Sequence, residues 1–229
     1  MSKVDISVVI PTRNEADSIG KVIDDIVKTL VGLHFEIIIV DTESTDGTIE
    51  IAKSKGAKIE PEPRRGYGRA YKTGFAKAKG DFIATLDADM TYPADRIPEF
   101  IHLLQQGHDF VSGDRLTGLE TESMTGMHRT GNAILNIAFR LLYGYPIKDS
   151  QSGMWIFKRT VLEKVEVLSD GMPFSEELKL EAIKKGFKFI EVPIDYHPRI
   201  GEKKLRSFPD AWANLKYLFL KRFGWTGSP

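Results

Sequence analysis

The sequence predicts an α/β fold in which a mostly parallel central sheet is flanked by helices. Up to residue 89, short apolar runs that resemble buried strands alternate with segments whose apolar residues recur at helical spacing. Such alternation is typical of a parallel sheet with helices packed on it. Two of the runs lead directly to an aspartate, Asp41 and Asp87, and open α/β sheets bind ligands beyond the carboxyl ends of their strands. A length of 229 residues suits one such domain.

The first half of the chain is expected to supply four strands and three helices. A turn at Asp46-Gly47 separates the second strand from the helix that follows it. The expected order is strand (5–11), helix (from Ile19 to Leu30), strand (35–41), helix, strand, helix (to Ala78) and strand (81–86).

The second half is expected to continue the pattern and to end in an amphipathic helix. The helix expected at 176–185 has an amphipathic pattern, and Gly186 should end it. We assign residues 1–205 to the domain and residues 206–225 to the C-terminal helix. The other expected elements are helices at about 94–106, 131–143 and 176–185 and strands at 110–111, 151–158 and 188–196.

The composition agrees with a compact enzyme and excludes several classes of function. Lysine plus arginine and aspartate plus glutamate both number 32, so the net charge gives no reason to expect nucleic acid as a partner. A sequence without cysteine has neither disulfides nor thiolate metal sites. No apolar stretch approaches the ~20 residues of a membrane helix. We therefore expect a cytoplasmic protein that is at most peripheral on the cytoplasmic membrane face.

Asp87-Ala88-Asp89, directly after the fourth strand, is the most informative motif of the chain. Two carboxylates one residue apart are poorly placed for a core. They are well placed to hold Mg²⁺ or Mn²⁺, which prefer oxygen ligands and bridge carboxylates to phosphates. A solvated loop is the simpler interpretation of such a pair alone, so its weight comes from other segments that suit the same substrate.

Three further polar segments suit a phosphate-bearing nucleotide. The loop 11–15 follows the first strand, and 42–48 follows the second, although residues 44–46 also suit helix capping. The segment 64–70 opens the third helix. Its glycines allow a backbone to approach a ligand closely, and its arginines suit phosphate. It is not a dinucleotide fingerprint, because the third glycine is missing and it does not follow the first strand.

Together these segments resemble the nucleotide-sugar half of the inverting glycosyltransferases of family 2, which have the GT-A fold. The resemblance implies that Asp89 holds the metal and that Asp87 shares it or faces the nucleotide, with Thr91 as a further ligand. The residues that it assigns to the nucleotide sugar are Pro11, Arg13, Glu15, Val40, Asp41, Ser44, Gly66, Arg69, Asp87, Ala88 and Asp149.

The second half narrows the resemblance to the polyprenyl-phosphate (dolichol-phosphate) glycosyltransferases, the dolichol-phosphate mannose synthase group. Family members that build polysaccharide usually carry a Gln-x-x-Arg-Trp segment, which this sequence lacks. One position departs from the group: Thr91 stands where the mannose synthases commonly have glutamine. The segments that carry the resemblance are 111–115, 127–132, 149–157, 175–178 and 199–205.

The resemblance implies transfer of a sugar from UDP-glucose, UDP-N-acetylglucosamine or GDP-mannose to dolichyl or polyprenyl phosphate. A phosphate monoester has a second pKa of ~6 and is already an anionic nucleophile at neutral pH, so no general base is required. Bringing two polyanions together suits the planar fork of arginine. Arg115, Arg129 and Arg199 match the positions that clamp the acceptor phosphate and are, with Asp89, the expected catalytic residues. A surface position or a structural ion pair is the alternative for each arginine.

Two other functions stay open at this point. One is a family 2 enzyme acting on a soluble hydroxyl acceptor, with Glu176 or Glu177 as base; these acids open a helix, and we interpret them as structural or sugar-binding. The other is a non-catalytic nucleotide-sugar-binding module. Asp149 and Ser152-Gly153 match a loop that lines the donor sugar, and a capped turn is the alternative for them.

The C-terminal segment carries apolar residues at helical spacing, among them Trp212, Leu218 and Phe219. An interfacial helix of this kind would bring the domain to a membrane that holds a polyprenyl phosphate. Packing on the domain's own core is the alternative, and the two are compatible. The cations expected to face headgroups or solvent are Lys203, Lys204, Arg206, Lys216, Lys221 and Arg222.

Overall fold

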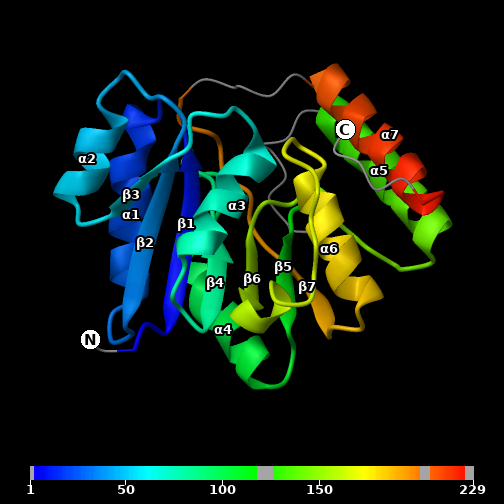
Figure 1. The fold of residues 1–229 in the computed structure, drawn as a ribbon, viewed down its shortest axis with the longest axis horizontal. Coiled ribbons are helices and arrows are strands. Elements are labelled where there is room, and N and C mark those ends of the chain that lie inside the picture. The colour runs from blue at the N-terminus through cyan, green and yellow to red at the C-terminus, as the bar shows by residue number, and fades with distance from the viewer. Residues whose placement is uncertain (1–2, 118–125, 202–206, 225–229) are drawn as a thin grey trace.

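The computed structural model describes residues 3–117, 126–201 and 207–224, so Lys203, Lys204 and Arg206 lie outside the described residues. A seven-stranded sheet with the order β3-β2-β1-β4-β6-β5-β7 is covered by helices (Figure 1). The predicted α/β fold is thereby confirmed. The strands are β1 (Ile6–Thr12), β2 (Phe35–Asp41), β3 (Lys58–Pro61), β4 (Phe82–Thr85), β5 (Phe110–Asp114), β6 (Trp155–Lys158) and β7 (Phe189–Pro193). The helices are α1 (Ala16–Thr29), α2 (Thr48–Ser54), α3 (Tyr67–Lys77), α4 (Ile97–Gln105), α5 (Gly126–Tyr143), α6 (Phe174–Lys184) and α7 (Ser207–Arg222), with short 3₁₀ helices at Ala94–Arg96 and Arg159–Val161.

β1, β2 and β4 place their carboxyl ends side by side. β1 pairs in parallel with β2 up to Thr12, which lies opposite Asp41. On its other side β1 pairs in parallel with β4, with Val9 opposite Thr85. The loops that follow these three strands therefore start from one edge of the sheet, where α/β proteins bind their ligands.

β6 is antiparallel to both of its neighbours, β4 and β5. Its first residue, Trp155, lies opposite Thr85 of β4 and Ser112 of β5. Because β6 runs the other way, the segment 149–154 enters the sheet at the edge where β4 and β5 leave it. This reversal brings the second half of the chain to the Asp87 loop.

Apolar clusters fill both faces of the sheet. Successive residues of a strand point to opposite faces, so Val8 lies in one cluster with α1 and α4, and Val9 lies in the other with α3 and α6. A third, smaller cluster joins α5, α6 and α7 through Phe139, Leu180 and Leu218. These layers hold the loops at the carboxyl edge on a rigid base.

α6 is a helix as predicted, but the amphipathic interpretation was wrong. Each residue from 174 to 182 is buried, and these include Glu176, Glu177 and Lys179. The helix lies between the sheet on one side and α5 and α7 on the other, so it has no wide solvent face. Buried polar side chains need hydrogen-bond partners. Glu176 and Lys179 find theirs in the segment 149–152, whereas Glu177 finds its partners in the backbone of Leu168 and Ser169 and in Lys221 of α7.

Other boundaries differ by a few residues from those expected. α5 begins at Gly126 instead of 131, and the helix expected at 94–106 is a 3₁₀ turn followed by α4. β5 extends to Asp114, whereas β6 begins only at Trp155.

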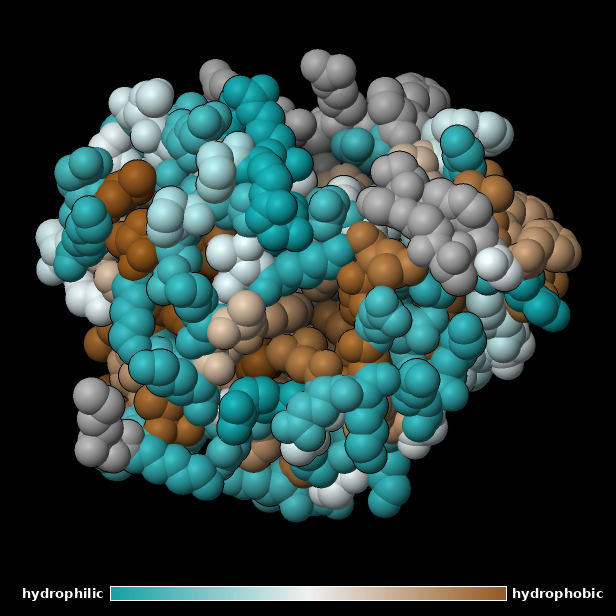
Figure 2. Space-filling model, viewed as in Figure 1, coloured by the Kyte–Doolittle hydropathy of each residue, from teal (hydrophilic) through white to brown (hydrophobic). Residues whose placement is uncertain are grey.

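α7 packs on α5 and α6 with one face and exposes the other. Leu218 and Tyr217 are buried, whereas Trp212 is 68% and Phe219 is 47% exposed. Tyr143 of α5 donates a hydrogen bond from its hydroxyl to the carbonyl oxygen of Leu218. Exposed apolar side chains of α5 and α7 gather at this end of the molecule (Figure 2). None of the described helices is both long enough and apolar enough to cross a bilayer.

Candidate active site

The loops after β1 and β2 are joined by hydrogen bonds that cross between them. The backbone N–H of Asn14 donates to Ser44 Oγ over 2.8 Å, and Thr45 N–H donates to Asn14 Oδ1 over 2.9 Å. Glu15 N–H donates to Thr48 Oγ1 over 2.8 Å. The two loops therefore form one unit, and it contains the predicted residues Arg13, which is exposed, and Glu15, which is buried.

Asp41 is the centre of this unit. Its carboxylate accepts hydrogen bonds from Thr12 Oγ1 (2.8 Å), from Ser44 N–H (2.9 Å) and from Ser44 Oγ (2.5 Å). The carboxylate is buried, with 3% of the residue exposed. The structure thus gives Asp41 an internal role, which is to hold the β1 and β2 loops together. Of the expected capping residues, Asp46 does accept a hydrogen bond from Thr48 N–H, at the start of α2.

Two predicted residues point their side chains into the core. Val40 belongs to the apolar cluster under α3 and α6, and Ala88 belongs to the cluster under α1 and α4. Pro11 is half-buried in β1, opposite Val40 of β2. A ligand at this edge would meet the backbone of Val40 and Ala88.

Glu62 organises the segment that opens α3, and sequence reasoning missed it. Its buried carboxylate accepts hydrogen bonds from Arg64 Nε (2.9 Å), Arg69 Nε (3.0 Å) and Thr73 Oγ1 (2.6 Å). The predicted phosphate ligand Arg69 is therefore held in place by an acid. The available signal was the position of Glu62, directly after β3 at the same edge of the sheet.

The glycines that precede and open α3 serve close packing within the protein. A Cβ at Gly66 would lie 2.4 Å from the carbonyl oxygen of Asp170, and one at Gly68 would lie 2.6 Å from Phe174 Cβ. These contacts leave no space for a side chain. The structure therefore explains both glycines by the approach of the segment 169–174 to α3, whereas the sequence suggested the approach of a ligand.

Asp89 is buried and engaged on both carboxylate oxygens. Oδ1 accepts hydrogen bonds from Thr91 N–H (3.1 Å) and Thr91 Oγ1 (2.6 Å). Oδ2 pairs with Arg199 Nη2 over 2.6 Å. The structure thus brings together Asp89, Thr91 and Arg199, which the sequence assigned to metal and acceptor phosphate.

Asp87 lies among hydroxyl groups next to Gly153. A Cβ at Gly153 would lie 2.6 Å from the hydroxyl of Tyr67, 3.3 Å from that of Tyr92 and 3.5 Å from Asp87 Oδ1. Gly153 N–H donates to the Tyr92 hydroxyl over 2.7 Å. Burial, reinforced by the negative charge of Asp89, raises the pKa of Asp87 to about 7, although Arg199 and Arg115 oppose the rise.

The oxygen donors at this point fit a hard divalent cation. Asp87 and Asp89 supply carboxylates and Thr91 supplies a hydroxyl, and a cation would offset the repulsion between the two acids. Arg199 now occupies Asp89 Oδ2, so it would compete with the cation for that oxygen. Within the described residues, no group of three His, Cys, Asp or Glu side chains forms a metal site. Substrate phosphates or water would have to complete the coordination.

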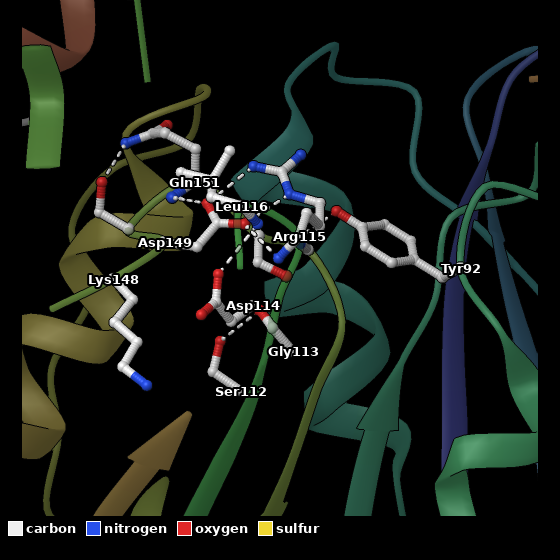
Figure 3. Close-up of polar contacts among 12 residues, drawn as sticks. Tyr92, Ser112, Gly113, Asp114, Arg115, Leu116, Lys148, Asp149 and Gln151 are labelled. Carbon is white, nitrogen blue, oxygen red and sulfur yellow. Dashed lines mark hydrogen bonds and ion pairs between the residues drawn. The ribbon is translucent and has the colours of Figure 1, made fainter. Parts of the chain in front are cut away.

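Arg115 and Asp149 form a buried ion pair (Figure 3). Arg115 Nε donates to Asp149 Oδ2 over 2.7 Å and Nη2 donates to Oδ1 over 2.9 Å, in the bidentate geometry of strong pairs. The guanidinium also lies 5.3 Å from the ring centroid of Tyr196. Burial raises the pKa of a carboxyl, but Arg115 outweighs this and holds the pKa of Asp149 below its ordinary value. The Asp149 carboxylate therefore orients Arg115.

The remaining predicted arginine lies on α5, and the two predicted acids lie on α6. Arg129 is exposed in the first turn of α5. Glu176 accepts a hydrogen bond from Gln151 Nε2 over 2.8 Å, and burial raises its pKa well above the ordinary value. Glu177 accepts hydrogen bonds from two backbone N–H groups and pairs with Lys221. Glu177 thus uses its carboxylate for internal contacts, whereas Glu176 uses one oxygen and leaves Oε1 buried without a hydrogen bond among the described residues.

Backbone strain marks three loops of the site. Asn14, Glu43 and Met90 have φ values of 52°, 53° and 66°, in the left-handed region that side chains other than glycine rarely adopt. They follow β1, β2 and β4 respectively. Strained residues of this kind tend to gather at functional sites, where the surrounding structure enforces them.

His197 was also missed from the sequence. Its backbone N–H donates to the carbonyl oxygen of Thr91 over 3.0 Å, and Ile200 N–H donates to that of Asp89 over 3.0 Å. The segment 197–200 therefore runs beside the Asp-x-Asp loop and places both His197 and Arg199 there. No spacing rule in the sequence links residues more than a hundred positions apart.

This architecture defines a class of protein. An open α/β sheet, with carboxylates and arginines gathered where β1, β2 and β4 end and β6 begins, is that of a glycosyltransferase with the GT-A fold. The chain belongs to glycosyltransferase family 2: the family model described as "Glycosyl transferase family 2" matches residues 7–166.

Curated relatives agree with this assignment. The chain is 36% identical over 225 residues to the low-salt glycan biosynthesis hexosyltransferase Agl6 of Haloferax volcanii, covering 96% of this chain but 54% of that protein. It is 36% identical over 205 residues to a dolichyl-phosphate hexose transferase of the same organism, covering 89% and 88%. A dolichol-phosphate mannosyltransferase of Pyrococcus furiosus is 32% identical over 211 residues, with 88% and 59% covered. The chain thus spans about half of the first relative and most of the second.

Solved structures share the fold. Glucosyl-3-phosphoglycerate synthase from Mycobacterium tuberculosis, in complex with Mn²⁺, UDP and glucosyl-3-phosphoglycerate, superposes with a TM-score of 0.77 at 23% identity, over 97% of this chain and 81% of that one. The same enzyme with Mg²⁺ and UDP gives a TM-score of 0.73 at 23% identity, over 97% and 80%. At this identity the likeness shows the fold alone.

Proposed function

We propose that the chain transfers a sugar from a nucleoside diphosphate sugar to the phosphate of a dolichyl or polyprenyl lipid, with inversion at the sugar carbon. The observation that carries this proposal is a pair of arginines, each oriented by a buried carboxylate: Arg115 by Asp149 and Arg199 by Asp89. An anionic acceptor needs such donors and no general base. The names of the two dolichyl-phosphate relatives support the same acceptor.

The donor would bind at the linked loops of β1 and β2. Arg13, Glu15, Asp41 and Ser44 would surround the base and ribose, with Pro11, Val40 and Ala88 contributing backbone. Gly66 and Arg69 lie at the start of α3, where the arginine held by Glu62 would reach the diphosphate. The solved neighbours bind UDP or UDP-glucose, which supports a nucleotide sugar as donor.

Asp89, with Asp87 and Thr91, would hold Mg²⁺ or Mn²⁺. When bound, the cation would stabilise the negative charge of the departing diphosphate. Thr91 already fixes one oxygen of Asp89, so the carboxylate is preoriented. The neighbours crystallised with Mn²⁺ or Mg²⁺ support this cofactor.

A soluble hydroxyl acceptor is the second candidate, and the acids of α6 argue against it. An alcohol needs a base, for which Glu176 or Glu177 was the sequence candidate. Glu176 is bound by Gln151, and Glu177 is bound by two backbone N–H groups and by Lys221. Neither carboxylate has the exposure that a base on an incoming alcohol would need.

Contact with the membrane surface would come from the exposed side of α5 and α7. Ile134, Ile137 and Leu141 of α5 are 52%, 53% and 81% exposed, and Trp212 and Phe219 of α7 also face outward. Apolar and aromatic residues on a partly cationic helix suit the interface between lipid and water. We propose a peripheral association that brings the site to the headgroup region.

The test is transfer from UDP-glucose, UDP-N-acetylglucosamine or GDP-mannose, with Mg²⁺ or Mn²⁺, to a polyprenyl phosphate in detergent and to 3-phosphoglycerate as the soluble acceptor. We expect transfer to the lipid phosphate alone. Arg115→Ala and Arg199→Ala should reduce it by roughly ten- to a hundredfold, the effect of losing one charge-assisted contact of about 1.5–3 kcal/mol. Arg129→Ala tests the third arginine. Efficient transfer to the soluble alcohol, with none to the lipid phosphate, would overturn the proposal.

A further inference from the structure

We infer that Lys179 is a positioning residue for the transfer reaction: its ammonium group fixes the Asp149–Ser152 loop and, through Asp149, the guanidinium of Arg115. This inference deepens the proposed function and rests on it for the role of Arg115. Lys179 lies in the middle of α6 and is fully buried.

The ammonium group of Lys179 is saturated by a single loop. Nζ donates to the carbonyl oxygens of Asp149 (2.8 Å), Ser150 (3.1 Å) and Ser152 (3.0 Å). A lysine has three N–H donors and no acceptor, so all three donors are used. Three carbonyl groups of neighbouring residues can converge on one point only if the loop folds around that point.

Removing the ammonium group would deprive the Asp149–Ser152 loop of the donor that its carbonyl groups share. Three buried carbonyl groups would each lose a hydrogen bond, although Ser152 O keeps the one from Trp155 Nε1 (2.5 Å) and Asp149 O keeps a long one from Ser152 N–H (3.5 Å). Each hydrogen bond lost in the interior is costly. The loop would have to rearrange around the missing group, above all at Ser150, whose carbonyl oxygen accepts from Lys179 over 3.1 Å. The Asp149 side chain starts from the same loop, so its carboxylate would move. Arg115 would then lose its bidentate partner.

The same loop also reaches the other side of the site. After Ser152, Gly153 donates its N–H to the Tyr92 hydroxyl and accepts a hydrogen bond from Thr85 Oγ1 over 2.7 Å. Gly153 is the residue that lies next to Asp87. One buried cation on α6 therefore supports the loop between Arg115 and Asp87.

The charges around Lys179 explain why a lysine is tolerated there. Burial lowers the pKa of Lys179 to about 8, although the carboxylates of Asp149 on the loop, Glu191 on β7 and Glu176 on α6 raise it. Arg115 opposes them. The cation is thus present at neutral pH and loses its proton as the pH rises through about 8.

The sequence contains no cysteine, so the test can use chemical replacement of the side chain. Lys179→Cys is alkylated while unfolded, refolded, and compared in two forms. Aminoethylation restores an ammonium at the length of lysine, whereas propylation gives a neutral side chain of the same length. Lys184→Cys, on the same helix with a half-exposed side chain, is the matched control.

We expect the aminoethylated form to recover the wild-type turnover number. The propylated form should lose about a hundredfold, the scale of a displaced catalytic contact, while nucleotide binding changes little. The wild-type rate should also fall above pH 8, and this fall should be absent from the propylated form. The two forms of Lys184→Cys should match wild type.

Equal turnover numbers for the aminoethylated and propylated forms, measured at a temperature where both are folded, would overturn the inference. If the propylated form does not refold, Lys179→Gln, which keeps an amide donor, takes its place in the same comparison. If wild type transfers to an acceptor other than lipid phosphate, the proposed function fails. The turnover numbers of the aminoethylated and propylated forms are then compared with that acceptor, which tests the role of Lys179 separately.

Discussion

Asp89 has two protein partners on its carboxylate, and this decides what its substitution should do. Asp89→Asn keeps the shape and the contact with Thr91 but removes the charge that pairs with Arg199. We expect a folded protein whose transfer rate falls by roughly a hundredfold or more, the scale of losing one electrostatic group at a reacting centre. Asp95→Asn, an exposed acid in the adjacent 3₁₀ turn, is the control.

The measurement is the transfer rate with and without excess chelator. Wild type should lose activity in chelator and regain it when Mg²⁺ or Mn²⁺ is returned. Full wild-type activity in chelator would rule out the metal role proposed for Asp87, Asp89 and Thr91.

The Arg115–Asp149 pair makes a stability prediction with a defined pH dependence. Arg115→Met leaves the Asp149 carboxylate buried without its partner, which should cost about 3–5 kcal/mol at pH 7. Asp149 has a lowered pKa in the folded protein, so its contribution is complete above the unfolded-state pKa of about 3.9 and is lost as the pH falls through the folded-state pKa.

The free-energy difference between wild type and Arg115→Met should therefore be largest at neutral pH and shrink towards acid pH. Urea unfolding at pH 7 and at pH 3, which lies below the unfolded-state pKa, measures it. Arg96→Met, at a more exposed ion pair with Glu99, should show a small and nearly constant difference. A constant difference for Arg115→Met as well would show that packing, not charge, explains its effect.

At the scale of the element, the loop after β4 depends on an unusual backbone conformation at Met90. Its φ of 66° suits asparagine, which tolerates the left-handed region, and is strained for β-branched residues. Met90 also packs on the apolar core. Met90→Asn therefore loses packing but keeps the backbone, whereas Met90→Ile keeps an apolar side chain and adds strain of about 1–3 kcal/mol.

We expect Met90→Asn to be the more active of the two variants, because Asp89 and Thr91 flank this position and depend on its backbone. Transfer rates and the free energy of unfolding are to be measured for both. A more active Met90→Ile would mean that side-chain packing controls the loop. Leu103→Ile, a partly buried helical position on the same cluster, controls for the β-branched side chain itself.

The elements themselves were largely predictable, and their environment was not. Periodicity correctly predicts α6, because the spacing of Leu178 and Ala182 is helical in any environment. It could not predict that Glu176, Glu177 and Lys179 are buried, because this depends on α7 covering the helix from outside. Likewise, a short apolar run shows that β6 is a strand but contains no information on its direction.

The candidate site was predictable where its residues belong to sequence motifs. It was not predictable where side chains form ion pairs or hydrogen bonds with one another. Asp87, Asp89 and Arg199 were all predicted as site residues from the sequence, and the structure brings them together. The pairing of Asp149 with Arg115, and of Arg69 with Glu62, depends on distances across the sheet edge that the sequence does not contain. Glu62 and Lys179 resemble ordinary surface residues in the sequence, and only their burial distinguishes them.

At the scale of the whole molecule, the two faces of α7 should respond differently to substitution. Trp212→Ser with Phe219→Ser changes the exposed face, and we expect it to abolish co-sedimentation with anionic liposomes while leaving the melting temperature unchanged. Leu218→Ala removes a fully buried side chain and should cost about 2–5 kcal/mol of stability. It should sediment with liposomes as long as it is folded.

Both measurements, sedimentation and thermal melting, are made on all variants. Co-sedimentation of the Trp212→Ser/Phe219→Ser protein at the wild-type level would leave α7 with a packing role only. A parallel Ile137→Ser/Leu141→Ser variant tests whether α5 contributes to the same surface.

The reversed direction of β6 has a consequence for how the protein folds during its synthesis on the ribosome. β4 is complete at residue 85, but the strand that covers its free side is made only at 155–158. Until then a nascent chain presents an open strand edge, a template for pairing with other chains. β5 must wait for the same strand. Shortened chains that end before Trp155 should therefore depend on chaperones or precipitate. The sheet edge that carries the proposed site should form in a single late step.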